Sequence, residues 1–181
     1  MSPLASIEVG ECGVDNSGVG NSGSNTNDTK SIGFYLKGKD LRDIFLRTPE
    51  TASGKFGIYA ESDNSDWNWD IQIERPIIDG FTQTGIHLQG LNGAGSTTIN
   101  GGYLVGSGDC LWAEDWKSVV ITGGTQFLKS GSAHSGVRFK NSSYCSVIGN
   151  RFSNITYPLS FDASSYNVAS GNVINAHSTA G

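Results

Sequence analysis

The chain has three acidic residues whose carboxyl groups and spacing would suit cleavage of a glycosidic bond. They are Glu61, Asp109 and Glu114. Glu61 and Glu114 end two short segments of the same alternating type, with one similar segment between them. Inverting glycosidases hold two carboxyl groups about 6.5 to 9.5 Å apart, which leaves room for a water molecule. Glu61 with Glu114 is therefore one predicted catalytic pair, and Asp79 with Asp109 is an alternative.

A second group of side chains could bind a sugar. Its members are aromatic, imidazole or guanidinium groups at loop or outward positions: Tyr59, Trp67, Trp69, His87, Trp112 and Arg138. Sugar rings pack their C–H groups on the electron-rich faces of aromatic rings. Outward rings also pack on loops or on a neighbouring subunit, and opposite charges on adjacent strands stabilise a sheet. The sequence leaves both interpretations open.

These residues recur because the chain repeats a segment in which apolar and polar residues alternate. The segments begin at Gly57, Gly85, Cys110, Gly136 and Pro158, at intervals of 28, 25, 26 and 22 residues. Alternation with a period of two predicts strands with one buried face and one exposed face. Stacking would align the outward positions in two columns, Tyr59, His87, Trp112, Arg138, Ser160 and Glu61, Gln89, Glu114, Lys140, Asp162.

A second series of apolar residues has a similar period. Its members are Ile73, Ile99, Ile121, Val147 and Ala169, at intervals of 26, 22, 26 and 22 residues. The breaks that follow are corners in which positive φ costs Gly nothing and Asn little. They are Gly101-Gly102, Gly123-Gly124, Gly149-Asn150 and Gly171-Asn172. No helical pattern separates the strands, and periods in this range are typical of solenoids.

The sequence therefore predicts an all-β fold, a parallel β-helix of about five to six coils over residues 56–181. Each coil would bury its inward residues only by stacking on its neighbours. The predicted inward residues are Ile58, Ala60, Ile71, Ile73, Ile86, Leu88, Thr97, Ile99, Leu111, Ala113, Val119, Ile121, Val137, Phe139, Cys145, Val147, Leu159 and Phe161.

The N-terminal part of the chain has a different composition. Residues 1–30 are rich in Gly, Ser and Asn and are expected to form a flexible arm, with one short strand over residues 4–9. Residues 31–55 are expected to hold a strand and then a short helix over residues 40–47, with Asp40 as its N-cap. An open solenoid end exposes a strand edge, so this helix is predicted to cap the β-helix.

The repeated strand, Gly-Asn corner and strand units resemble a known family. Their clearest examples are Val147-Ile148-Gly149-Asn150-Arg151-Phe152 and Val168-Ala169-Ser170-Gly171-Asn172-Val173-Ile174. Over about residues 56 to 177 the chain resembles the pectin-lyase-like right-handed β-helix proteins, most of all the tailspikes and tail fibres of bacteriophages. The resemblance implies a right-handed coil and a homotrimer, and it specifies architecture better than activity.

One short motif is similar to part of an enzyme signature. Gly108-Asp109-Cys110 matches the end of the Gly-Asp-Asp-Cys motif of polygalacturonases, with Asp109 at its second Asp. The first Asp is absent, and His134 and Arg138 do not follow that family's spacing. These departures argue against hydrolysis of galacturonan. Asp109 is kept as a catalytic candidate, but not for that substrate.

Composition excludes several classes of partner. Twelve Lys and Arg against 17 Asp and Glu give a net charge of −5 without a basic run, so nucleic acid is not an expected partner. No apolar run is long enough for membrane insertion, and no signal peptide is visible. The three cysteines and three histidines lack metal-ligand spacing, so no metal or cofactor is expected. Cys12, Cys110 and Cys145 are predicted to be small buried hydrophobes, Cys145 most clearly because it takes an inward position.

The sequence thus predicts a bacteriophage virion projection, at the virion surface or outside the cell, that binds host surface polysaccharide. A polysaccharide depolymerase, either glycosidase or lyase, is one alternative. A purely structural virion component, whose N-terminal arm docks on another virion protein, is the other.

Overall fold

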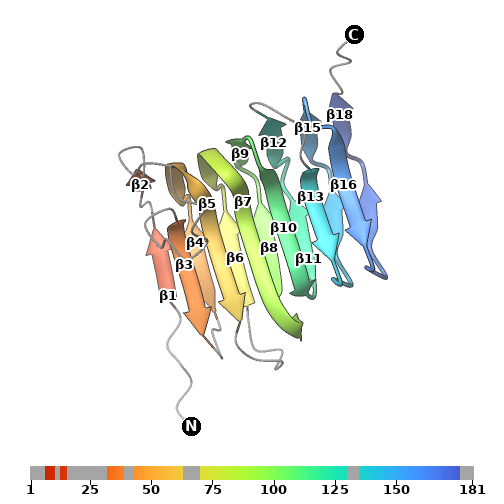
Figure 1. Cartoon of the computed structure of the whole chain (residues 1–181), viewed down its shortest axis with the longest axis horizontal. Helices are drawn as coiled ribbons and strands as arrows, with labels where there is room; N and C mark the ends of the chain where they lie inside the picture. Colours follow the sequence, from red (N-terminus) through yellow and green to blue (C-terminus); the bar gives the residue numbers. More distant parts are fainter. Residues whose placement is uncertain are drawn as a thin grey trace.

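A computed structural model describes residues 7–10, 13–15, 32–38, 43–62, 70–129 and 135–175. All regular structure in these ranges is β-strand. The strands lie side by side and parallel, from the red N-terminal end to the blue C-terminal end of Figure 1. The prediction of a parallel β-solenoid is confirmed. No helix in the described part of the chain is long and apolar enough to cross a membrane.

The strands form three faces, because the chain turns between strands on every lap. Face 1 is one parallel sheet, in the order β1 (Ile7–Gly10), β4 (Ile44–Arg47), β6 (Asp70–Glu74), β8 (Ser96–Asn100), β11 (Val119–Thr122), β14 (Ser146–Ile148) and β17 (Val168–Ser170). Most residues of an inner strand of face 1 therefore have a counterpart in the strands before and after it.

Faces 2 and 3 share two long strands, β5 (Glu50–Ser62) and β7 (Ile77–Ala94), which change register near Gly54 and Phe81. Face 2 contains their first parts with β2 (Gly13–Asp15), β9 (Tyr103–Gly106), β12 (Gln126–Lys129), β15 (Arg151–Ser153) and β18 (Val173–Asn175). Face 3 contains their later parts with β3 (Ile32–Gly38), β10 (Asp109–Trp116), β13 (Ser135–Lys140) and β16 (Tyr157–Asp162).

The predicted core lies between the three faces. Every predicted inward residue from Ile58 to Val147 is buried, with at most 1% of its surface exposed. Face 2 adds residues that the sequence analysis had not placed, namely Ile78, Leu104, Phe127 and Phe152. Leu159 is only partly buried and Phe161 is 42% exposed, because both lie on the last strand of face 3.

Glycine and asparagine form the corners as predicted. Gly149 and Gly171 have φ of 70° and 63°, which lets the chain leave face 1 after β14 and β17. The next residue, Asn150 or Asn172, turns its side chain back to the previous coil. The Asn150 side chain accepts from Thr125 N at 3.1 Å and donates to Ile121 O at 2.9 Å. The Asn172 side chain makes the same two contacts one coil later. It accepts from Asn150 N and donates to Val147 O.

The prediction of a capping helix over residues 40–47 is wrong for the part of that range that the structure describes. Ile44–Arg47 form β4, which pairs with β6 and β1. Ile44 and Leu46 are buried while Phe45 and Arg47 point outward, so this segment has the period of a strand. Residues 40–42 lie outside the described residues. Within the predicted arm, β1 and β2 pair with β4 and β5 and so extend the stack, and residues 16–30 lie outside the description.

Candidate functional site

The two predicted outward columns exist on face 3. Register pairs join Tyr59, His87, Trp112, Arg138 and Ser160 in one row, and β3 adds Tyr35 at its N-terminal end. We call this row the ring column. The parallel row, the charge column, contains Lys37, Glu61, Gln89, Glu114, Lys140 and Asp162.

The rings of the ring column stack on one another along the solenoid axis. Ring centroids are 5.5 Å apart for Tyr35 and Tyr59, 4.9 Å for Tyr59 and His87, and 4.6 Å for His87 and Trp112. The guanidinium of Arg138 lies 5.0 Å from the centroid of Trp112 and ends the stack with a cation–π contact. The faces of the inner rings are therefore covered by their neighbours, and only ring edges point to solvent.

His87 is the most enclosed member of the stack. It is 7% exposed, and neither ring nitrogen has a hydrogen-bond partner among the described residues. Burial lowers the pKa of His87 to about 4, although the nearby charge of Glu114 acts in the opposite direction. His87 is thus neutral at pH 7. Direct contact between its ring face and a sugar would require Tyr59 and Trp112 to separate.

The charge column is held by contacts between adjacent strands. Lys37 Nζ lies 3.2 Å from Glu61, and Lys140 Nζ lies 2.5 Å from Glu114. Tyr59 donates to Gln89, which links the two columns. The side chains of Glu61 and Glu114 are 29% and 19% exposed, and that of Lys140 is 37% exposed. The column is therefore ordered and still reachable from solvent.

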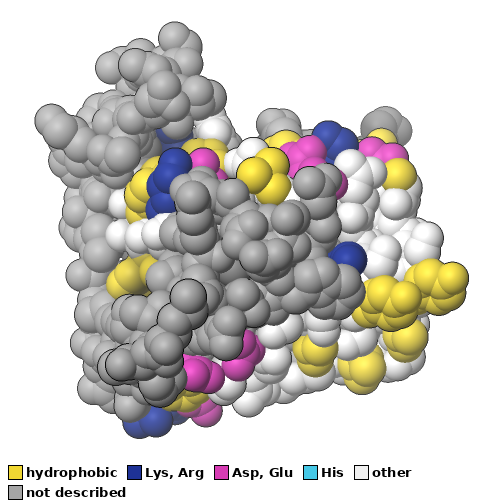
Figure 2. All heavy atoms as spheres, turned by 90° about the horizontal axis from the view of Figure 1, so that it is seen from below, with side chains coloured by type: hydrophobic (Ala, Val, Ile, Leu, Met, Phe, Trp, Pro, Cys, Tyr) yellow, Lys and Arg dark blue, Asp and Glu magenta, His cyan; other side chains and the backbone are white. Residues whose placement is uncertain are grey.

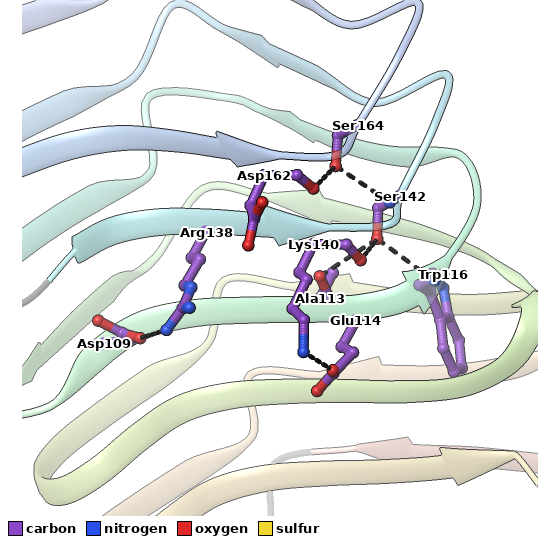
Figure 3. A network of polar contacts seen from close by, with 9 residues as sticks. All are labelled: Asp109, Ala113, Glu114, Trp116, Arg138, Lys140, Ser142, Asp162 and Ser164. Atoms are coloured by element: carbon purple, nitrogen blue, oxygen red, sulfur yellow. Dashed lines mark hydrogen bonds and ion pairs between the residues drawn. The ribbon is translucent and has the colours of Figure 1, made fainter.

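Asp109 lies at the start of β10, on the same face. Ser135 N donates to its carboxylate at 2.7 Å, and a guanidinium nitrogen of Arg138 lies 3.9 Å from the other carboxylate oxygen. Figure 3 shows Arg138 reaching toward Asp109 and Lys140 reaching toward Glu114 from the same strand, β13, with Asp162 on the strand beyond. Arg138 thus contacts both a ring and a carboxylate.

The predicted carboxylate pairs have different geometries. Glu61 and Glu114 are in one row with Gln89 between them, so two strand spacings, about 9 to 10 Å, separate their backbones. Asp79 lies beside Val105 on face 2, whereas Asp109 lies beside Thr84 on face 3, so these two acids are on different faces.

The surroundings of Glu61 do not favour a general acid. The hydroxyl of Tyr35 donates to the Glu61 carboxylate, and this contact lowers the pKa of Glu61, with Lys37 adding to the effect against burial. A general acid needs a raised pKa so that it still holds a proton at working pH. Glu61 is therefore set up as a hydrogen-bond acceptor and ion-pair partner.

Face 1 carries a feature that the sequence analysis did not single out. A depression of about 200 Å³ is lined by Phe45, Gln72, Ile73, Glu74, Thr98 and Asn100. Arg47 lies over Phe45 at 5.2 Å from its centroid and 3.7 Å from Glu74. The period-two pattern of residues 44–47, which the helix prediction overlooked, would have placed Phe45 and Arg47 on this outer surface.

Other predicted site residues have different outcomes. Trp67 and Trp69 lie outside the described residues, so their contact with a sugar stays a prediction. Tyr35 and Lys37 were missed, although Tyr35 precedes Tyr59 by 24 residues, close to the repeat period. Cys110 and Cys145 are buried free thiols, which confirms the prediction for both, and Cys12 lies outside the described residues.

Fold and site define a parallel β-solenoid with an ordered ladder of rings and charges on one face. No family model, no curated protein and no solved structure matches the chain. The fold therefore stands on the strand pairing of this chain alone, and fold does not by itself define function.

Proposed function

We propose that this protein is a virion projection, like a bacteriophage tailspike or tail fibre, that binds a linear host surface polysaccharide along the charge column. One observation carries the proposal. Carboxylate, amide and ammonium groups alternate in one solvent-accessible row, at one group per strand, over the length of face 3.

The chemistry of the column suits a chain of hydroxyl-bearing rings. Carboxylates accept hydrogen bonds from hydroxyls, ammonium groups donate them, and the Gln89 amide does both. Because adjacent strands lie about 4.8 Å apart, a glycan along the axis meets a polar group at every strand. The ion pairs of Glu61 and Glu114 already hold these side chains in place, so less side-chain entropy is lost on binding.

The ring column has a supporting role in this proposal. Its stacked inner faces are covered, so Tyr59, His87 and Trp112 offer edges, while they keep the neighbouring charge column straight. Tyr35, at 40% exposed, and Arg138 are the members with the most access to a ligand. Sugar stacking on Trp67 and Trp69 belongs to the proposal as well.

The virion setting and the homotrimer rest on the resemblance of the Gly-Asn corner units. Within the proposal, the projection stands at the virion surface as a trimer. The N-terminal arm, residues 1–30 apart from the stacked strands β1 and β2, docks it on another virion protein. A second function, a purely structural virion component, is favoured by one observation. The inner ring faces and two charge pairs of the ladder, Lys37 with Glu61 and Lys140 with Glu114, are already satisfied within the chain.

The test is binding to a panel of bacterial capsular polysaccharides and exopolysaccharides by affinity electrophoresis. The double variant Glu114→Gln/Lys140→Gln removes one ion pair of the charge column and is expected to weaken binding at least about tenfold, the loss of about 1.4 kcal/mol. A matched control, Glu74→Gln/Arg47→Gln, removes an ion pair on face 1 and is expected to bind like the wild type. Circular dichroism verifies that both variants fold.

Reducing-end release in the same samples distinguishes the remaining functions. Release by the wild type that is lost in Glu114→Gln or Asp109→Asn would identify a depolymerase. If the protein binds no glycan, or if both double variants bind equally well, the charge column is not a glycan-binding site. Failure to bind any glycan would favour the structural component.

A further inference from the structure

The C-terminal end of the solenoid exposes an unusual amount of apolar surface. Eight of the eleven exposed large hydrophobic side chains among the described residues lie between residues 144 and 174. Figure 2 shows hydrophobic side chains gathered at the end of the molecule where Figure 1 places the blue strands. Such a patch on a soluble protein is typical of an interaction surface.

Each last strand at this end has one edge that pairs with no other described strand. Among the described residues, β16 pairs with β13 alone, β17 with β14 alone and β18 with β15 alone. Phe161 and Ile174 continue the inward rows of Phe139 and Phe152 and are 42% and 50% exposed. A partner that fits must therefore supply three parallel strands with inward apolar residues.

The N-terminal end of the solenoid has three parallel strands that could pair with these edges. In the part of the chain that is described, β1 pairs with β4 alone, and β2 and β3 pair with β5 alone. Phe34 and Leu36 lie in the inward rows of face 3 and pack partly on the core. Stacked directly beyond β16, β3 would place Phe34 beside Leu159 and Leu36 beside Phe161.

Charge also matches between the two ends. Within the chain, Lys140 bonds Glu114 and has Asp162 as its next neighbour in the charge column. At the other end, Lys37 bonds Glu61. With β3 next to β16, the column would read Glu114, Lys140, Asp162, Lys37 and Glu61, so opposite charges would alternate across the junction.

We infer that the C-terminal coil docks the N-terminal coil of a second copy of this chain, head to tail, so that the three faces continue across the junction. Such an interface is heterologous: each copy uses one surface to bind and another to be bound, so association does not end at two copies unless a ring closes. This goes beyond glycan binding, because it would extend the charge column from one copy to the next.

The test blocks each end separately. Phe161→Lys places a charge on the C-terminal docking surface, and Phe34→Lys places one on the N-terminal surface. Wild type is expected to show a weight-average mass of at least twice the 19.1 kDa of one chain, rising with concentration, by light scattering after gel filtration. Each variant alone is expected to keep one size at every concentration, which is one chain, or three chains where the proposed homotrimer forms side by side. An equal mixture of the two variants is expected to double that size and stop there.

Controls keep the test decisive. Ser170→Lys adds the same charge to the same coil at an exposed position that points outward, and it is expected to associate like the wild type. Ile174→Lys and Leu36→Lys replace the primary variants if circular dichroism shows that either has not folded. A wild-type mass equal to that of the end variants, growth of either blocked variant with concentration, or no doubling in the mixture would each overturn the inference.

Discussion

The middle of the stack and its C-terminal end differ sharply, although their sequences have the same pattern. Phe139 and Phe161 are register neighbours at the same inward position, yet Phe139 is fully buried and Phe161 is 42% exposed. Phe152 and Ile174 differ in the same way. Alternation therefore sets which way a side chain points, and the following coil determines whether it is buried.

The largest expected effect comes from a charge in the middle of the stack. Val137→Asp buries a carboxylate where the native side chain has no exposed surface, and it should cost more than about 4 kcal/mol and prevent folding. Ala169→Asp, at an exposed inward position of the last coil, should cost less than about 1 kcal/mol.

Circular dichroism and urea unfolding of dilute protein would measure both variants. Equal tolerance of the two would mean that the strand phase is displaced by one residue, which exchanges the inward and outward faces.

Removing one ring from each region sharpens the contrast. Phe139→Ala should lower the free energy of unfolding by about 3 to 5 kcal/mol, because the cavity is enclosed on all sides. Phe161→Ala should cost less than half as much, since solvent already reaches that ring. Urea midpoints at equal m-values provide the measurement, and matching losses would show that the end is as well packed as the middle.

His87 should make the middle of the stack sensitive to acid. Its pKa is about 4 when folded, against an ordinary value of 6.5, so the unfolded state binds the proton more tightly. The stability associated with neutral His87 is complete above pH 6.5 and falls by about 3 kcal/mol as the pH drops from 6.5 to 4.

The variant His87→Phe keeps a ring in the stack and removes the titration. Its free energy of unfolding should fall less over this pH range than that of the wild type. Parallel pH profiles for the two proteins would contradict the buried, neutral state of His87.

The corner asparagines give the smallest expected difference. Asn150 is 1% exposed, so Asn150→Ala leaves Thr125 N and Ile121 O buried without partners, at about 2 to 3 kcal/mol. Asn172 is more exposed, and Asn172→Ala should cost about 1 kcal/mol because water can replace its side chain. Thermal unfolding would rank the two variants, and a larger loss for Asn172 would reverse the comparison.

Much of the fold follows from the sequence because a period of two and a repeat of 22 to 28 residues act together. They predicted the inward residues of faces 1 and 3, the corners and both outward columns. They failed at residues 44–47, where the spacing of Leu41, Ile44 and Phe45 suits a helix. Pairing of Ile44 and Leu46 with Ile71 and Ile73 favours the strand instead, and such pairing is not a local signal.

The site was less predictable than the fold. Repeat spacing placed Tyr59, His87 and Trp112 in one row, but it carries no information on side-chain rotamers. Whether rings lie flat toward solvent or stack along the axis depends on those rotamers and on neighbouring strands. The ion pairs of Glu61 and Glu114 follow from the same rows, since lysines occupy adjacent positions.

The asparagine corners also constrain how the length of this molecule can change. The Asn172 side chain accepts a hydrogen bond from the backbone of Asn150, 22 residues earlier. The Asn150 side chain accepts one from the backbone of Thr125, 25 residues earlier. A deletion of residues 150–171 would join Gly149 to Asn172 and restore a Gly-Asn corner. Loss of one residue within a coil would instead misplace every later contact. Relatives of this chain should therefore differ in length by whole coils.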